Sequence, residues 1–225
     1  MERKLTSRKA RTVLCLGPRH SGKSVFGYIL FKSLLELGND ACVMDGDYYA
    51  PTYRRVRIEE FASPDEYARI FTTPNAVKLT KLTEDNFRRG VQSTHDLIEY
   101  EGIIVLDGIG KHSGSTEALL ELADMLIVLC SDRFDVTTES EPCSYTIENQ
   151  PLHPFDFYAR RKTKYITIKT HYRNEKTAVF DPRSLRAELF DLEITSVKKG
   201  NVDGIPSETR QIIREIASFI LANWV

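Results

Sequence analysis

The stretch Thr12-Val-Leu-Cys-Leu16-Gly17-Pro-Arg-His-Ser-Gly22-Lys23-Ser24 decides the fold of this 225-residue chain. Residues 12–16 form an apolar run that predicts a buried strand. From Lys23 to about Leu37 the apolar residues recur at helical spacing, and Gly38 with Asn39 follows as a helix stop. The sequence therefore predicts a strand, a glycine-containing loop and a helix in direct succession.

The loop from Gly17 to Ser24 matches the pattern G-x-x-x-x-G-K-(S/T). A triphosphate requires several backbone N–H donors close together, and two glycines permit such a backbone path. We expect Lys23 to reach the β- and γ-phosphates and Ser24 to supply an oxygen to Mg²⁺, beside the positive end of the helix dipole. The alternative is a chance match on a turn, which would not require the flanking strand and helix. The predicted ATP-binding residues are Gly17, Pro18, Arg19, His20, Ser21, Gly22, Lys23, Ser24 and Val25, and Lys23 is also a predicted catalytic residue.

Strands and helices alternate over the rest of the chain, which predicts parallel βαβ connections. Strands are expected at 41–44, 102–106, 125–130, 164–170, 178–180 and 189–195, and helices at 64–71, 83–100, 116–123 and after Ser207, which is the expected N-cap of the last helix. The predicted fold class is α/β, with three layers and a mainly parallel sheet flanked by helices. We expect a single domain over residues 1–225, in which the polar segment 131–163 is a candidate lid or insertion.

Acidic residues follow two of the predicted strands. Asp45 and Asp47 follow the second strand, and Asp107 follows the third. The carboxyl ends of parallel strands meet at the ligand-binding edge of a sheet. Asp107 can support Mg²⁺ there together with Ser24, and Asp45 or Asp47 can orient an acceptor hydroxyl and take its proton. The alternative at both places is a polar turn at the strand end.

The composition narrows the function classes. The net charge of −1 provides no overall basic field for non-specific nucleic-acid binding. No apolar stretch approaches the ~20 residues needed to cross a bilayer, and the basic N-terminus lacks the apolar core of a signal peptide. We therefore expect a cytoplasmic protein without a membrane partner. The guanine-reading sequence (N/T)-K-x-D does not occur, which favours ATP over GTP. Self-association into a homo-oligomer stays open.

The loop and the two acidic strand ends together give residues 11–131 a resemblance to the P-loop NTPase superfamily. Within it, Met44-Asp45-Gly46-Asp47 resembles the LDGD segment of adenylylsulfate kinases, and Asp45 to Tyr49 is similar to the D-x-F-Y segment of uridine kinases. This resemblance implies that the acid receives a proton from the acceptor hydroxyl. It departs at Ala50, where adenylylsulfate kinases carry an arginine, so their particular substrate is not implied.

A second resemblance is narrower. Gly17 to Val25 resembles the GPPHSGKSV loop of P-loop domains that accompany a CRISPR-associated ring nuclease, and Glu117 to Ser131 is similar to the strand region that follows in those proteins. For the ATPase portion, this implies a CRISPR-associated protein partner and a place beside cyclic-oligoadenylate signalling. The ParA/MinD-type ATPases instead carry a signature lysine directly after the first glycine of the loop. This chain has Pro18 there, which argues against that branch.

The favoured function is therefore that of an enzyme with a three-layer P-loop NTPase fold. It would act as an ATP- and Mg²⁺-dependent phosphotransferase of the kinase type on a small hydroxyl-bearing or nucleotide-like substrate. The alternative is an ATP-hydrolysing switch or accessory ATPase, in the CRISPR-linked sense.

Overall fold

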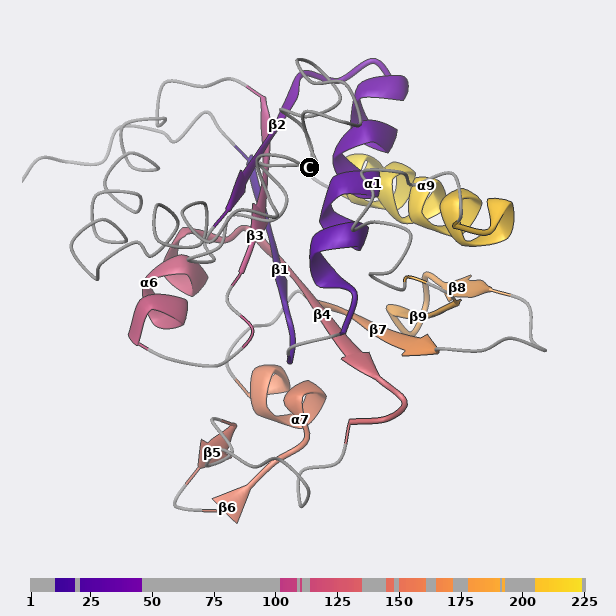
Figure 1. Cartoon of the computed structure of the whole chain (residues 1–225). Helices are drawn as coiled ribbons and strands as arrows, with labels where there is room; N and C mark the ends of the chain where they lie inside the picture. The colour runs from indigo at the N-terminus through magenta and orange to yellow at the C-terminus, as the bar shows by residue number, and fades with distance from the viewer. Residues whose placement is uncertain are drawn as a thin grey trace, which may run out of the picture.

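A mainly parallel sheet runs through the middle of the computed structural model, with helices on both faces (Figure 1). The structure describes residues 11–18, 21–45, 102–108, 110, 114–134, 145–147, 150–160, 165–171, 178–190, 192 and 205–223. The sheet strands within these ranges are β1 (Arg11–Leu16), β2 (Ala41–Asp45), β3 (Ile103–Asp107), β4 (Met125–Ser131), β7 (Tyr165–His171), β8 (Val179–Asp181) and β9 (Arg186–Phe190). A separate small pair is formed by β5 (Thr146–Ile147) and β6 (Gln150–Pro151). The helices are α1 (Lys23–Glu36), α6 (Gly114–Leu122), α7 (Pro154–Ala159) and α9 (Ser207–Ala222).

The strand order places β1 inside the sheet, between β3 and β4. The order is β2-β3-β1-β4-β7-β9-β8, and each neighbouring pair is parallel except β8 with β9. The predicted three-layer α/β fold with a mainly parallel sheet is thereby confirmed. In open sheets of this kind, ligands bind outside the carboxyl ends of the strands.

The carboxyl ends of β1, β2 and β3 are level with one another. Cys15 of β1 is in register with Asp107 of β3, and Asp107 is in register with Asp45 of β2. On the other side of β1, Leu16 is in register with Val128 of β4. The backbone at both acidic positions therefore lies at the edge from which the loop after β1 departs.

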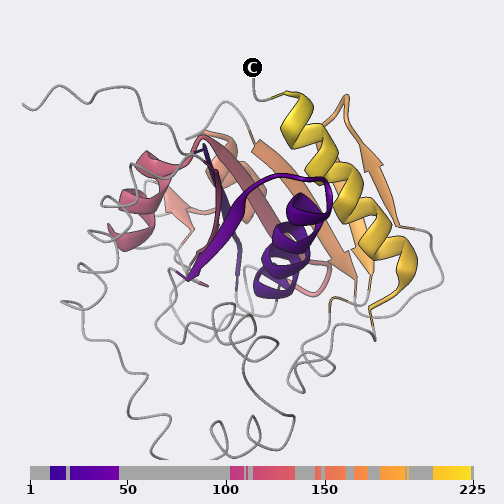
Figure 2. The same ribbon diagram turned by 90° about the horizontal axis from the view of Figure 1, so that it is seen from above.

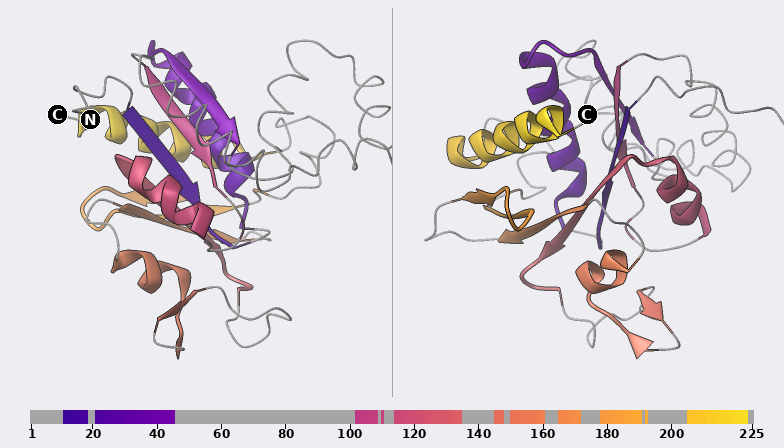
Figure 3. Two further views of the ribbon diagram at one scale, coloured as in Figure 1. Left: turned by 90° about the vertical axis from the view of Figure 1, so that its left-hand side faces the viewer. Right: turned by 180° about the vertical axis from the view of Figure 1, so that it is seen from behind.

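The two faces of the sheet have separate hydrophobic cores. α1 and α9 cover one face, whereas α6 and α7 cover the other (Figure 2 and Figure 3). Successive residues of β1 alternate between these cores, as the pleat of a strand requires. Val13 and Cys15 belong to the core under α1 and α9, and Leu14 and Leu16 belong to the core under α6 and α7.

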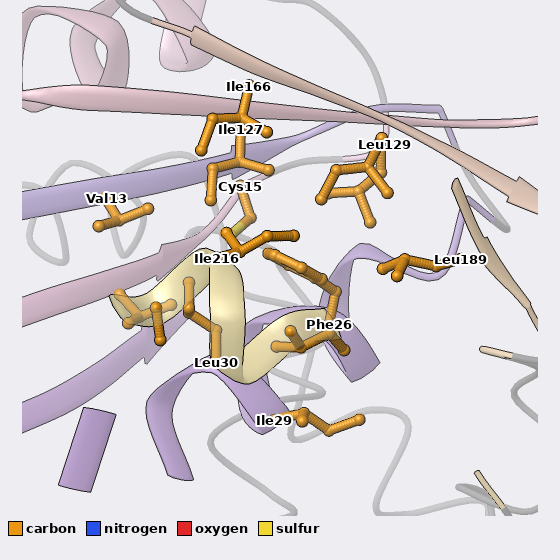
Figure 4. Packing of buried hydrophobic residues seen from close by; sticks show 14 of the residues in the cluster. Val13, Cys15, Phe26, Ile29, Leu30, Ile127, Leu129, Ile166, Leu189 and Ile216 are labelled. Atoms are coloured by element: carbon orange, nitrogen blue, oxygen red, sulfur yellow. The ribbon is translucent and has the colours of Figure 1, made fainter. Parts of the chain in front are cut away.

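Packing under α1 fixes the helix that follows the loop. Phe26 and Leu30 of α1 and Ile216 of α9 are fully buried, and Figure 4 shows them among the side chains of the central strands. Burying a side chain of this size contributes about 1.5–3 kcal/mol. The start of α1 is therefore held at the carboxyl end of β1 by its own apolar face.

Several predictions fall outside the described residues. These are the helices at 64–71 and 83–100, together with Asp47, Arg19 and His20. The strand predicted at 189–195 is misplaced, because β9 spans Arg186–Phe190. Asp181 accepts hydrogen bonds from Arg183 N and Ser184 Oγ, at 3.0 and 2.7 Å. The chain turns back at once, so that pairing with β8 begins at Arg186.

The last helix begins where the sequence predicts it, but Ser207 is not its N-cap. The N-cap is Pro206, no side chain caps the helix, and the Ser207 hydroxyl instead lies 3.5 Å from Glu208 Oε2. Ile213 and Ile220 are fully buried on the face that packs on α1. Among the described helices, none combines the length and apolar character that crossing a bilayer requires.

The described part of segment 131–163 includes α7, which packs on the same face of the sheet as α6. Phe157 and Tyr158 of this helix, and Tyr145 before it, are buried in that core. The aromatic rings meet edge to face, with centroids 5.5 Å apart for Tyr145 and Phe157 and 5.1 Å apart for Phe157 and Tyr158. Movement of the segment as a lid stays a prediction.

His153 caps α7 with a ring nitrogen. Its Nδ1 accepts a hydrogen bond from Phe155 N at 3.3 Å, and its Nε2 lies 3.5 Å from Cys130 Sγ. Burial lowers the pKa of His153, Asp156 opposes this shift, and Lys169 adds to it. A proton on Nδ1 would face the N–H of Phe155, so the cap requires the neutral ring.

We expect acid to weaken the docking of α7. The folded-state pKa of His153 lies below its unfolded value of about 6.5, so the unfolded chain takes up the proton first. The contribution of the cap is therefore complete above about pH 6.5 and declines as the pH falls towards the folded-state pKa. Urea unfolding at several pH values between about 5 and 8 measures the free energy of unfolding across this range.

The matched control is His153→Asn, because asparagine is a good N-cap that does not titrate. Below about pH 6.5, its unfolding free energy should depend less steeply on pH than that of the wild type. Identical pH dependence in the two proteins would contradict the assignment of His153 as a titrating cap.

Candidate phosphate-binding site

The chain leaves β1 at Gly17, where the backbone passes too close to β4 for a side chain. A Cβ atom at Gly17 would lie 2.0 Å from the carbonyl oxygen of Leu129, and the backbone φ angle there is 151°. Neither the space nor the conformation suits any other residue. The first glycine of the pattern is therefore required by the packing of the loop on the neighbouring strand.

Gly22 shapes the start of α1. Its φ of 81° and ψ of 6° lie in the left-handed region, and no side chain caps the helix. Phe26 N donates a hydrogen bond to Gly22 O at 2.9 Å. The N–H groups of Lys23, Ser24 and Val25 come earlier in the chain, so they have no acceptor within the helix. A left-handed residue followed by helical ones turns successive N–H groups towards one point, which forms an anion-binding concavity.

Two buried polar side chains of the loop suit an anion. Lys23 is only 7% exposed, and no carboxylate among the described residues lies within ion-pair distance of its ammonium group. Ser21 is 1% exposed, and its Oγ has no hydrogen-bond partner within the described part of the chain. Burying a hydroxyl without a partner is costly. A phosphate would pair with the ammonium and accept a hydrogen bond from the hydroxyl.

Two charged groups act on the thiol of Cys15 at the end of β1. Burial raises the pKa of Cys15 well above its ordinary value, the Asp107 carboxylate raises it further, and the Lys23 ammonium lowers it. Both charges therefore act on one sulfur atom near the end of β1. The strand-end acid and the loop lysine thus both influence the end of β1.

The loop after β3 holds Asp107 against β1. Asp107 is fully buried, and Gly108 N donates to Cys15 O at 2.8 Å. A Cβ atom at Gly108 would lie 2.2 Å from Leu16 Cδ2 and 2.8 Å from Cys15 O. The backbone after Asp107 therefore lies directly on the strand that leads into the loop.

The structure brings Gly17, Lys23, Ser24 and Asp107 to one edge of the sheet, at the end of β1. The backbone of Asp45 ends β2 at the same edge, two strands away from β1. The side chain of Asp45 lies outside the described part of the structure. The predicted roles of these residues in binding and catalysis stay predictions.

Two contacts of the loop with distant residues could not be predicted from the sequence. Thr170 Oγ1 donates to Ser21 O at 3.1 Å, and Leu192 packs so closely on Gly22 that a Cβ there would lie 2.9 Å from Leu192 Cβ. Both partners are far from the loop in sequence. Thr170 is one of several polar residues in an alternating strand, so no local signal distinguishes it.

Mg²⁺ could be held beside this loop by the Ser24 hydroxyl and the Asp107 carboxylate, because hydroxyl and carboxylate oxygens are ligands that Mg²⁺ accepts. Within the described ranges, no group of three His, Cys, Asp or Glu side chains could hold a metal alone. The donor set therefore fits a cation that shares its coordination with a phosphate and water.

The fold is similar to that of P-loop ATPases of the ParA/MinD type. A plasmid partition protein from Borrelia burgdorferi, solved with AMPPNP, is 14% identical and has a TM-score of 0.56 over 95% of this chain and 99% of that one. MinD from Pyrococcus horikoshii, solved with Mg-ADP, is 14% identical, with a TM-score of 0.55 over 95% and 98%. A chain of the MinC:MinD cell division protein complex of Aquifex aeolicus is 11% identical, with a TM-score of 0.53 over 96% of this chain and 97% of that one. No protein-family model and no curated protein matches the sequence.

These likenesses show the fold alone. Pro18 still occupies the position of the signature lysine of ParA/MinD-type ATPases, which is the feature that argued against that branch. The resemblances to small-molecule kinases and to the CRISPR-linked ATPase domain rest on short segments of sequence and stay predictions.

Gly108→Ala should destabilise the protein, because the added methyl group meets Leu16 and the carbonyl of Cys15. Overpacking of this kind costs about 1–3 kcal/mol in the free energy of unfolding, measured by urea denaturation. Gly27→Ala in α1 is the matched control. Its Cβ would meet only Val105 and Cys15 Sγ at ordinary contact distances of 3.7 and 3.9 Å, and it should be neutral or stabilising by up to about 1 kcal/mol. Equal stability of Gly108→Ala and wild type would contradict the close packing of this loop on β1.

Proposed function

We propose that this chain binds ATP with Mg²⁺ on the loop from Gly17 to Ser24 and hydrolyses it. The observation that carries the proposal is the buried residue Lys23, which begins α1 and has no carboxylate partner among the described residues. Positive charge and unpaired donors at a helix N-terminus favour a phosphate over any neutral ligand.

Each residue of the loop has a separate part in binding. The N–H groups of Lys23, Ser24 and Val25 donate to phosphate oxygens, and the Lys23 ammonium neutralises charge on the β- and γ-phosphates. Mg²⁺, when bound through Ser24 and Asp107, stabilises the charge that develops as the terminal phosphate is transferred. Gly17 lets the loop pack on β4, where a Cβ atom would meet the carbonyl oxygen of Leu129.

Two observations support an adenine nucleotide. Two structures of similar fold were solved with AMPPNP and with Mg-ADP. The guanine-reading sequence (N/T)-K-x-D does not occur in this chain. We propose ATP on these grounds.

A phosphotransferase is the second candidate. The backbone of Asp45 is in register with Asp107 at the edge where the phosphates would lie, which supports a strand-end acid that faces an acceptor hydroxyl. A carboxylate in this position contributes roughly 10²–10⁴-fold to transfer by taking the proton of the hydroxyl. The acceptor would be a small hydroxyl-bearing or nucleotide-like molecule. A CRISPR-associated protein partner would favour hydrolysis instead, as a switch.

Lys23→Ala should lower the affinity for Mg-ATP by at least about tenfold, which is ~1.4 kcal/mol, because it removes a charge-assisted contact to the phosphates. Calorimetric titration of Mg-ATP, with GTP as comparison, measures this. Lys32→Ala is the matched control, since it removes the same charge from an exposed position on the same helix. Equal binding by wild type and Lys23→Ala would contradict the phosphate site, and a clear preference for GTP would contradict the choice of base.

Asp47→Asn separates transfer from hydrolysis. If the protein is a phosphotransferase, this variant should lose transfer while its affinity for Mg-ATP stays within a few-fold of wild type, because the acid acts on the acceptor. Asp45→Asn is expected to have the same effect if that residue is the base. The assay follows γ-labelled ATP with nucleoside, nucleotide and oligoadenylate acceptors.

The control for this series is Asp40→Asn, an exposed acid before β2 at the opposite end of the strand. Suppose that free phosphate is the sole labelled product, and that Asp45→Asn and Asp47→Asn leave its rate of formation unchanged. The phosphotransferase would then be rejected, and the ATPase would remain.

A further inference from the structure

The loop from Gly17 to Ser24 is hydrogen-bonded to β7, which lies two strands away from β1 in the sheet. Thr170, near the carboxyl end of β7, is 4% exposed, and its Oγ1 donates to the carbonyl oxygen of Ser21 at 3.1 Å. Both residues are buried. The hydrogen bond therefore forms in a medium of low dielectric, where it is stronger than at the surface and its loss more costly.

This bond fixes the orientation of a peptide group in the loop. In a planar trans peptide, the C=O and the following N–H point in opposite directions. Because the carbonyl of Ser21 points towards β7, the N–H of Gly22 in the same peptide points away from it. Gly22 then adopts its left-handed conformation and leads into the first turn of α1. Holding one carbonyl thus fixes the peptide group that leads into the concavity of the Lys23, Ser24 and Val25 N–H groups, which we propose for the phosphates.

Further contacts hold Thr170 and its neighbour His171 in place. Thr170 O accepts a hydrogen bond from Asp132 N at 2.9 Å, which ties the ends of β7 and β4 together. The next residue, His171, has Nδ1 3.0 Å from Asp132 Oδ2 and Nε2 3.2 Å from Glu188 Oε2. Its ring stacks on Phe190 with centroids 4.7 Å apart. The ends of β4, β7 and β9 therefore form a cross-linked support for the Thr170 hydroxyl.

We propose that Thr170 is a positioning residue for the nucleotide, which it affects through the loop and without touching the ligand. This inference rests on the proposed function of the loop. Without the hydroxyl, the Ser21–Gly22 peptide can rotate, and the loop spends only part of its time in the binding form. The apparent dissociation constant rises by the inverse of that fraction.

The test compares Thr170→Val, which removes the hydroxyl and keeps the shape, with Thr170→Ser, which keeps the hydroxyl. Calorimetric titration with Mg-AMPPNP should show about tenfold weaker binding for Thr170→Val, as the loss of a buried hydrogen bond predicts. Thr170→Ser should bind within about twofold of wild type. Thr167→Val is the matched control on the same strand: its hydroxyl donates to Leu185 O at 3.5 Å, and it should bind like wild type.

Each outcome decides for or against the proposal. Weak binding by Thr170→Val that Thr170→Ser restores supports it. A lowered melting temperature of Thr170→Val with unchanged affinity shows a structural role only and overturns it, as does weak binding that serine fails to restore. If Thr170→Val does not fold, Thr170→Ala is titrated in its place, with the same expected loss. Lys23→Ala is measured alongside: if wild type and Lys23→Ala bind alike, the proposed function fails, whereas a loss in Lys23→Ala without a loss in Thr170→Val removes only the role of Thr170.

Discussion

The backbone of Gly17 packs directly on the carbonyl of Leu129 in β4, at a distance that excludes even a methyl group. This contact sets the path of the chain between β1 and α1. Because the loop stays this close to the sheet, the N-terminus of α1 comes to lie at the carboxyl ends of the central strands. The two apolar faces of the sheet then hold α1 and α6 in place, with Cys15 and Leu16 on opposite sides of the same strand.

Parallel register supplies the rest of the site. Since β1, β2 and β3 end level with one another, the acids that end β2 and β3 reach one edge of the sheet. Asp107 and Lys23 both act on the Cys15 thiol, because Asp107 raises its pKa and Lys23 lowers it. A positive charge, oriented N–H groups and a carboxylate oxygen are the elements that bind a phosphate together with Mg²⁺. The fold alone would host many functions, and it is this collection of groups at one edge that argues for a phosphate ligand.

Features that depend on neighbouring residues could be predicted from the sequence. The first strand, the loop, the helix after it and the acid that ends β3 follow from hydrophobic spacing and a motif of eight positions. Features that depend on distant residues could not. Thr170 bonds to a residue 149 positions away, the His153 cap forms where no helix was expected, and the start of β9 is set by the turn at Asp181. The likeness to ParA/MinD-type folds also extends over 95% of the chain, whereas the departure from that branch is the single residue Pro18.

The most direct test of the central claim is a structure of this protein determined with Mg-AMPPNP. The account predicts that the β- and γ-phosphates lie within hydrogen-bond distance of Lys23 Nζ and of the N–H groups at the start of α1. It also predicts that Mg²⁺ lies beside Ser24 Oγ, on the side of Asp107. Nucleotide bound elsewhere on the molecule, or a loop that stays empty at saturating Mg-AMPPNP, would contradict the account.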